Sequence, residues 1–229
     1  GGYLQDIDKF DSYHFRISPK EAEFIDPTQR LFLEVAYEAV EDAGLCGEKI
    51  YGSKTGVYVG IDTTPIIDSY SSIAMKSKEN FGNTGVVTSI LSSRVSYFLN
   101  LSGPSIVFDT ACSSSLVALH TAYKDIINNE CDSAIVGGIA LFYFPTERGV
   151  LESPTDTLLT FDKGANGTVW GEGIGAVVIK SLDKAVKDRD TIYAVIKGGA
   201  VNNDGASNGL TAPNAEAQEE VIIRAWKSS

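Results

Sequence analysis

The chain has 229 residues, of which 43% are hydrophobic and 21% are charged, and its formal net charge at pH 7 is -11. These values are ordinary for a globular protein of one or two domains, and they exclude a disordered tail, a collagen and a disulfide-framework miniprotein. An acidic chain is a poor binder of nucleic acid and of anionic membranes, and no apolar run approaches the roughly 18 residues of a membrane span.

The N-terminus and the cysteines suggest where the chain works. Its first residues lack the cationic and apolar blocks of a secretion signal. Three cysteines at irregular spacing are typical of reduced thiols, so we expect a cytoplasmic protein. The only methionine is Met75, so residue 1 is not a translation start, and we expect the chain to be a segment of a longer protein.

The first predicted elements are a helix and a short strand. Asp26 and Pro27 predict a helix start, because aspartate can cap and proline fits the first turn, and Gly44 predicts its end. Its apolar residues recur at helical spacing and predict a buried stripe of Leu31, Val35, Ala39 and Ala43. Residues 55–60 then predict a buried strand, and residues 61–82 predict a long surface excursion.

The later elements alternate between helix and strand. The next element is a helix over residues 86–99 with Val87, Ile90, Leu91 and Phe98 on one side. It is followed by a strand over 105–108, a helix from Ser113 to about Asn128, and a strand over 133–136 closed by Gly137 and Gly138. The last elements are a strand over 176–179, a short helix over 182–187, a strand over 192–196 and a helix from Pro213 to Trp226. Residues 145–173 and 202–208 predict loops. This alternation indicates an α/β protein with a largely parallel sheet.

The most informative stretch runs from Asp109 to Leu116 and reads Asp-Thr-Ala-Cys-Ser-Ser-Ser-Leu. Cys112 falls between a predicted strand and the helix that Ser113 opens, so it faces the positive end of a helix, which favours the nucleophilic thiolate. Free backbone N–H groups at this turn can stabilise an oxyanion on a thioester carbonyl, and the serines can cap the helix. A buried structural cysteine is the alternative that these residues leave open.

The other cysteines and the two histidines give this thiol no evident base. Cys46 and Cys131 lack the strand-to-helix context, and we interpret both as structural filler. His120 follows Cys112 by eight residues, roughly 12 Å along a helix. It shares a stripe with Leu116, Tyr123 and Ile127, so we interpret it as a packed core or interface residue. His14 has no partner in the sequence, and we interpret it as a surface or packing residue.

The residues around Cys112 resemble the active-site motif of β-ketoacyl synthase (ketosynthase) domains from modular polyketide synthases. Further blocks resemble the same family in the same order, namely residues 18–22 with 26–30, 82–85, 93–97, 161–162 with 171–173, and 208–213. The likeness runs along nearly the whole chain, which makes it far more specific than one short motif.

The resemblance implies a thiolase-like α/β fold, layered α-β-α-β-α and truncated, that acts as a homodimer. It implies that Cys112 accepts an acyl chain from the phosphopantetheine arm of an acyl carrier protein, with its own N–H as one oxyanion donor. The domain would then join that chain to a malonyl-type extender with loss of carbon dioxide. The implied partners are the carrier protein, a second copy and the remaining modules of the synthase. No cofactor is implied to bind directly, because the substrate arrives on the carrier.

The sequence departs from the family in its histidines. The family uses one histidine in a His-Gly-Thr-Gly-Thr run and one in an Asn-x-Gly-His run, and neither run occurs here. We expect residues 1–200 to form the N-terminal thiolase-like half without its first strand, and residues 201–229 to be a linker and first helix leading into an absent C-terminal half. We expect this segment alone to be unable to condense two acyl units, because donors for the enolate charge are missing.

Several alternatives can be weighed from the residues. Inside the family, a non-elongating domain that only transfers the acyl chain and a structural half-domain both stay open. A cysteine hydrolase is disfavoured, because Thr-Ala-Cys-Ser-Ser differs from the protease signatures. A nucleotide-binding module is disfavoured, because the glycine run over 171–175 precedes a strand. No pair of Cys or His has the spacing of a metal site. The acyl substrate is not indicated, although the loop over 61–80 is a candidate contributor to its pocket.

Overall fold

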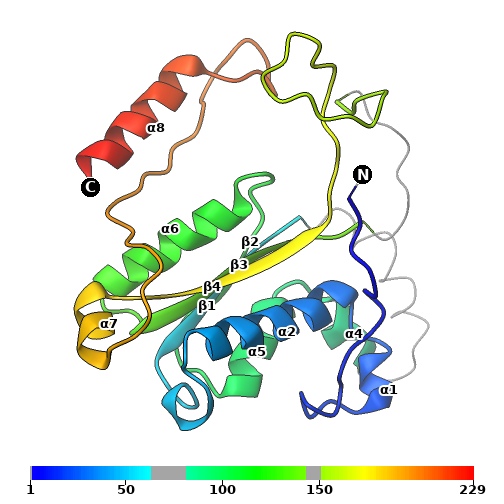
Figure 1. Ribbon diagram of the computed structural model, residues 1–229, viewed down its shortest axis with the longest axis vertical. Coiled ribbons are helices and arrows are strands. Elements are labelled where there is room, and N and C mark those ends of the chain that lie inside the picture. The colour runs from blue at the N-terminus through cyan, green and yellow to red at the C-terminus, as the bar shows by residue number, and fades with distance from the viewer. Residues whose placement is uncertain (1, 63–80, 143–150) are drawn as a thin grey trace.

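The computed structural model describes residues 2–62, 81–142 and 151–229 (Figure 1). These residues form a four-stranded sheet in the order β2-β1-β3-β4. The strands are β1 (Thr55–Ile61), β2 (Ser105–Phe108), β3 (Ser133–Ala140) and β4 (Gly173–Lys180). β1 runs parallel to β2 and to β3, whereas β4 is antiparallel to β3. The expected α/β class with a largely parallel sheet is therefore confirmed.

Helices cover both faces of this sheet. They are α1 (Pro19–Ala22), α2 (Pro27–Asp42), the 3-10 turn η1 (Gly47–Lys49), α4 (Phe81–Val86), α5 (Ile90–Leu99), α6 (Ser114–Ile127), α7 (Leu182–Asp188) and α8 (Ala215–Lys227). α2 packs on β3 and β4 and α5 on β1 and β2, while α6 packs on the opposite face (Figure 1). None of the described helices combines the length and the apolar content that crossing a membrane requires.

The helix expected after Asp26 is confirmed, but its buried face is rotated by about one residue. The Asp26 carboxylate accepts a hydrogen bond from the Thr28 N–H at 2.8 Å, and Pro27 occupies the first turn. The fully buried side chains of α2 include Phe32, Leu33, Ala36 and Val40, whereas the predicted stripe is half-buried. The larger side chains decide this orientation, because they fill the space between α2 and the sheet.

The single helix predicted over residues 86–99 is wrong, because the structure divides it. α4 ends at Val86 and α5 begins at Ile90, and tight turns link them through the Ile90 N–H to the Val87 carbonyl. Val87 and Thr88 are β-branched residues that disfavour helix. Val87 is 45% exposed instead of buried, and the core face of α5 is made by Leu91, Val95 and Leu99.

Two predicted strand boundaries also need correction. Gly137 and Gly138 do not close β3 but lie within it. Glycine is required at these two positions because neighbouring atoms fill the space that a Cβ would occupy. Residues 192–196 form neither helix nor strand, with a bend at Tyr193, so they belong to no strand of the described sheet. Tyr193 in this segment is 80% exposed. A strand forms only where an edge can pair with it, and these residues pair with neither edge.

The predicted surface excursion over 61–82 falls mostly outside the described residues.

The sheet separates two apolar cores. The larger core lies against α2 and α5, and β1 contributes Val57, Val59 and Ile61 to it. The smaller core lies against α6 and contains Tyr58, Ala118, Ala122, Cys131, Ala134 and Val136. Alternate residues of β1 therefore face opposite cores, and all seven residues of this strand are buried.

One partly buried hydrogen bond ties α6 to the sheet. The Tyr58 hydroxyl donates to the Asp125 carboxylate at 2.6 Å and lies 3.7 Å from the Cys131 sulfur. Burial raises the pKa of Tyr58, and the hydrogen bond to Asp125 raises it further, so the phenol stays protonated as a donor. The contact fixes the C-terminal part of α6 over β1.

Replacing this phenol with a phenyl ring removes the hydrogen bond and leaves the buried ring in place. We expect Tyr58→Phe to lower the free energy of unfolding by about 1–3 kcal/mol, because the Asp125 carboxylate loses a donor. Urea unfolding followed by circular dichroism measures the change. Tyr97→Phe is the control, since Tyr97 is 90% exposed on α5 and its effect should stay within about 0.5 kcal/mol. Equal effects of the two substitutions would contradict this account of α6.

Candidate active site

Cys112 lies at the edge of the sheet where α/β folds place their sites. β1, β2 and β3 are parallel, so their carboxyl ends meet at one edge. β2 ends at Phe108 and α6 begins at Ser114, and the thiol belongs to the short turn between them. The side chain of Cys112 is exposed. The structure therefore exposes this thiol at the sheet edge, and the buried alternative for this residue is wrong.

The turn that carries the thiol is sharp. Ala111 has a φ of +53°, a left-handed conformation that costs a non-glycine residue on the order of 1–3 kcal/mol. The Ala111 N–H donates to the Asp109 carboxylate at 3.4 Å. The chain thus turns from a strand into a helix around a strained residue that directly precedes the nucleophile, as in the nucleophile elbow of other α/β enzymes.

The Ser114 hydroxyl holds this turn closed. It accepts a hydrogen bond from the Thr110 N–H at 2.8 Å and donates to the Ala111 carbonyl at 2.7 Å. The Ser113 hydroxyl donates to the Thr110 carbonyl at 2.8 Å. The N-cap residue Ser113 makes no side-chain capping bond to the helix, so the serines brace the turn in place of the simple cap expected from the sequence.

Cys112 directly precedes the N-terminal turn of α6, where the helix dipole has its positive end. α6 is 14 residues long, and its positive end points toward the turn. No acidic side chain lies in its described first turn. Within the described residues, the Cys112 N–H makes no hydrogen bond of ordinary geometry. A donor without a partner at this position can bind an oxyanion that forms on the sulfur's target carbonyl.

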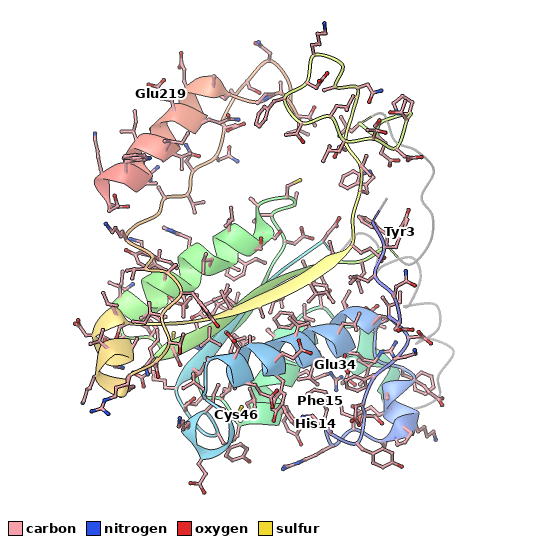
Figure 2. The ribbon with its side chains drawn as sticks, viewed as in Figure 1. Tyr3, His14, Phe15, Glu34, Cys46 and Glu219 are labelled. Carbon is pink, nitrogen blue, oxygen red and sulfur yellow. The ribbon has the colours of Figure 1, made fainter. Side chains whose placement is uncertain are left out.

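Neither histidine lies beside the thiol. His120 is half-buried on α6. Its ring lies against Gly199, since a Cβ added at Gly199 would be 2.9 Å from the His120 Nδ1. Burial, with a smaller effect of Lys124, lowers the pKa of His120. Figure 2 shows His14 beside Phe15 on the side of α2 and α5, across the sheet from α6. Its ring contacts Tyr37 at 4.8 Å between ring centroids.

The remaining cysteines differ from each other. Cys131 is buried at the edge of the smaller core, in agreement with a packing role, and burial raises the pKa of its thiol. Cys46 is exposed after α2, so its interpretation as filler is wrong. Gly44 and Gly47 on either side of it have positive φ angles, and these turns hold the residue at the surface.

The predicted stripe of Leu116, Tyr123 and Ile127 is not the face of α6 that packs on the sheet. Leu116 is 69% exposed, and Ser114, Ala118 and Ala122 face the sheet instead. The small residues at a spacing of four were the available signal, because a helix that lies close to a sheet has no room for larger ones. The structural role of Ser114 follows from its position on this buried face.

Other features of the described residues lie away from the thiol. An apolar groove runs between α6, β4 and residues 190–196, and Cys112 does not line it. In the described ranges, no three side chains of His, Cys, Asp or Glu gather closely enough to hold a metal ion.

The Glu172 carboxylate accepts hydrogen bonds from the N–H groups of Leu4 and Phe142, and so it fastens the N-terminal segment to the end of β3.

Two family models match this chain. The model for the N-terminal domain of β-ketoacyl synthase matches residues 1–185, and the model for the C-terminal domain matches residues 193–229. Among curated proteins, polyketide synthase PksL of Bacillus subtilis is 44% identical over an alignment of 226 positions, gaps included, that covers 96% of this chain and 5% of PksL. The hybrid PKS-NRPS synthetase apdA of Emericella nidulans is 43% identical over an alignment of 233 positions, gaps included, that covers 98% of this chain and 6% of the synthetase.

Solved structures show the same similarity. The ketosynthase from module 6 of the bacillaene synthase of Bacillus subtilis matches with a TM-score of 0.86 and 42% identity, over 99% of this chain and 38% of that one. The oxazolomycin ketosynthase domain OzmH KS7 of Streptomyces albus matches with a TM-score of 0.90 and 35% identity, over 100% and 40% of the two chains. The thiolase-like fold class expected from the sequence is confirmed.

The exposure of the three thiols makes a prediction about their chemical accessibility. We expect iodoacetamide to label Cys112 and Cys46 in the native protein and to label Cys131 only after unfolding in urea, because Cys131 is 2% exposed. Peptide mapping by mass spectrometry measures each site. Labelling of Cys131 as fast as Cys46 in buffer, or protection of Cys112, would contradict the described burial.

Proposed function

The chain belongs to the β-ketoacyl synthase family, and on this premise we propose that it forms the thiol-bearing part of a ketosynthase domain in a modular polyketide synthase. Cys112 is its acylated nucleophile. The observation that carries this proposal is the exposed Cys112 in a strained strand-to-helix turn, at the carboxyl edge of the parallel strands and inside the motif that resembles the family's active site.

The proposed reaction is the transfer of an acyl group between two sulfur atoms. The Cys112 thiol loses its proton to solvent, and its sulfur attacks the carbonyl carbon of a thioester on the phosphopantetheine arm of an acyl carrier protein. The Cys112 N–H binds the oxyanion of the tetrahedral intermediate. When the intermediate collapses, the bond to the pantetheine sulfur breaks and the leaving thiolate takes up a proton. The acyl chain remains on Cys112 as a new thioester.

The geometry supplies three contributions to this transfer. The positive end of α6 stabilises the thiolate. The Ala111 turn and the Ser114 hydroxyl hold the sulfur in one position, which lowers the entropy cost of attack. The exposure of Cys112 admits a flexible arm. No imidazole among the described residues assists the step, so the reactivity of the thiol depends on the backbone.

The chain spans about two fifths of the ketosynthase structures that it resembles, and much less of the curated synthases. The later condensation with a malonyl-type extender is therefore proposed for the complete domain. The proposed division assigns residues 1–200 to its N-terminal half and residues 201–229 to the start of the other half, which is within about ten residues of the place where the match to the C-terminal model begins. A non-elongating domain would acylate Cys112 in the same way, so acyl transfer is the activity common to both.

The proposed partners are the acyl carrier protein, the other modules of the synthase and a second copy of this domain, in the cytoplasm. No strand within the described residues covers the outer edge of β2, where Ser105 and Ile106 are exposed. An open sheet edge of this kind pairs readily with another strand, which supports the homodimer. The substrate's phosphopantetheine belongs to the carrier protein, and the domain needs no cofactor of its own.

Acyl labelling of the purified full-length protein tests the proposal. Incubation with an acyl N-acetylcysteamine thioester should add one acyl mass to the peptide that contains Cys112. Cys112→Ala should abolish this addition, whereas Cys46→Ala should retain it, because Cys46 is exposed but precedes only the three-residue 3-10 turn η1 and lies in no strand-to-helix elbow. Labelling that survives Cys112→Ala would contradict the proposed nucleophile.

Condensation should be absent from the isolated 229-residue chain. The family's two histidine motifs do not occur in it, and positioned donors are needed to stabilise the enolate formed on decarboxylation. The measurement is β-ketoacyl product by mass spectrometry, from acyl and malonyl carrier proteins mixed with the chain. A complete ketosynthase domain serves as the positive control. Product release by the chain alone would refute this part of the proposal.

A further inference from the structure

The first turn of α6 touches the sheet through two glycines. Gly60 on β1 and Gly138 on β3 are partners in the parallel register. A Cβ added at Gly60 would lie 2.4 Å from the backbone nitrogen of Ser115 and 2.5 Å from the carbonyl carbon of Ser114. A Cβ added at Gly138 would lie 2.8 Å from the Cβ of Ser115. All three distances are shorter than real Cβ contacts, so only glycine fits at these two positions.

The residues facing α6 become smaller toward the thiol. Near the C-terminal end of the helix, the facing residues are Tyr58 and Val136, and the Tyr58 hydroxyl reaches Asp125. Two residues further along the same strands, the facing residues are Gly60 and Gly138. The helix therefore comes closest to the sheet at its N-terminal turn, directly after Cys112.

We propose that Gly60 and Gly138 are positioning residues for acyl transfer to Cys112, because their missing side chains set how close the first turn of α6 lies to the sheet. This inference rests on the proposed function. The turn from Thr110 to Ser114 connects β2 to this helix, and the Ser114 hydroxyl links both sides of it. A displacement of the first helical turn therefore moves the sulfur and the Cys112 N–H together, away from the positions that the attack requires.

The chemistry separates this role from a merely structural one. Acyl transfer needs the sulfur to approach a carbonyl while a fixed donor binds the oxyanion, so a shift of a few tenths of an ångström slows it. Alkylation by iodoacetamide needs only an accessible thiolate and tolerates the same shift. The ratio of the two rates at Cys112 therefore reports on positioning and cancels general changes in thiol exposure.

The adjacent glycine gives a matched control. A Cβ added at Gly137 would lie 2.4 Å from the Phe32 ring, so this residue is equally crowded, but it faces α2 on the other side of the sheet. In the full-length protein, Gly138→Ala should slow acylation of Cys112 by an acyl N-acetylcysteamine thioester about tenfold or more. Its alkylation should change less than about threefold. Gly137→Ala should leave both rates within about threefold of the original protein, whatever it does to thermal stability.

A second substitution tests whether the contact itself is responsible. Since the crowding at Gly138 involves the Cβ of Ser115, Ser115→Gly removes the opposing atom. The double variant with Gly138→Ala and Ser115→Gly should acylate as fast as Ser115→Gly alone. If Gly138→Ala does not fold, the double variant should recover both folding and acylation. Gly60→Ala meets backbone atoms instead, so Ser115→Gly should not rescue it.

The outcomes are distinguishable. If the original protein is not acylated at all, the proposed function fails before this inference is reached. If it is acylated, equal acylation rates for Gly138→Ala and the original protein overturn the positioning role. The same conclusion follows from an equal loss of acylation in Gly137→Ala, or from failure of Ser115→Gly to restore the Gly138→Ala variant.

Discussion

The contact on which the structure depends is the approach of one helix to the sheet at two positions without side chains. α6 rests on β1 and β3 through small residues along its length, and its first turn meets Gly60 and Gly138 at close range. Close packing makes such a contact stiff, because neither surface has a flexible side chain that can yield. The opposite end of α6 is fixed by the hydrogen bond between Tyr58 and Asp125. The helix is thus held at both ends over the same strand.

This placement explains how an ordinary thiol becomes a candidate nucleophile. The five-residue connection from β2 to α6 has to turn sharply, and it does so through the left-handed Ala111. The strain is tolerated because the Ser114 hydroxyl bonds to both sides of the turn. Cys112 then stands exposed at the positive end of the helix, with its own amide available to an oxyanion. In the proposed function, the reactivity of Cys112 comes from this fold, and the first transfer needs no neighbouring imidazole.

Much of the fold could be predicted from local sequence, and its failures have a common cause. Asp26 and Pro27 predicted the start of α2 correctly, because helix capping depends only on neighbouring residues in the chain. The motif around Cys112 likewise predicted the strand-to-helix turn. Gly137 and Gly138 were misinterpreted as a strand end, because the atoms that exclude their side chains come from α2, β4 and α6. The segment over 192–196 has the composition of a strand but no partner in the described sheet. Long-range contacts of this kind leave no local pattern.

Cys112 and Cys46 compete within one molecule, and this competition tests the account most directly. Both thiols are exposed, but only Cys112 belongs to the braced turn at the start of α6. The measurement is the ratio of acyl-modified peptides for the two cysteines after a brief exposure of the full-length protein to an acyl thioester. The account predicts that nearly all of the acyl group is found on Cys112. Equal acylation of Cys112 and Cys46 would contradict it, because the turn would then give its sulfur no advantage over an ordinary surface thiol.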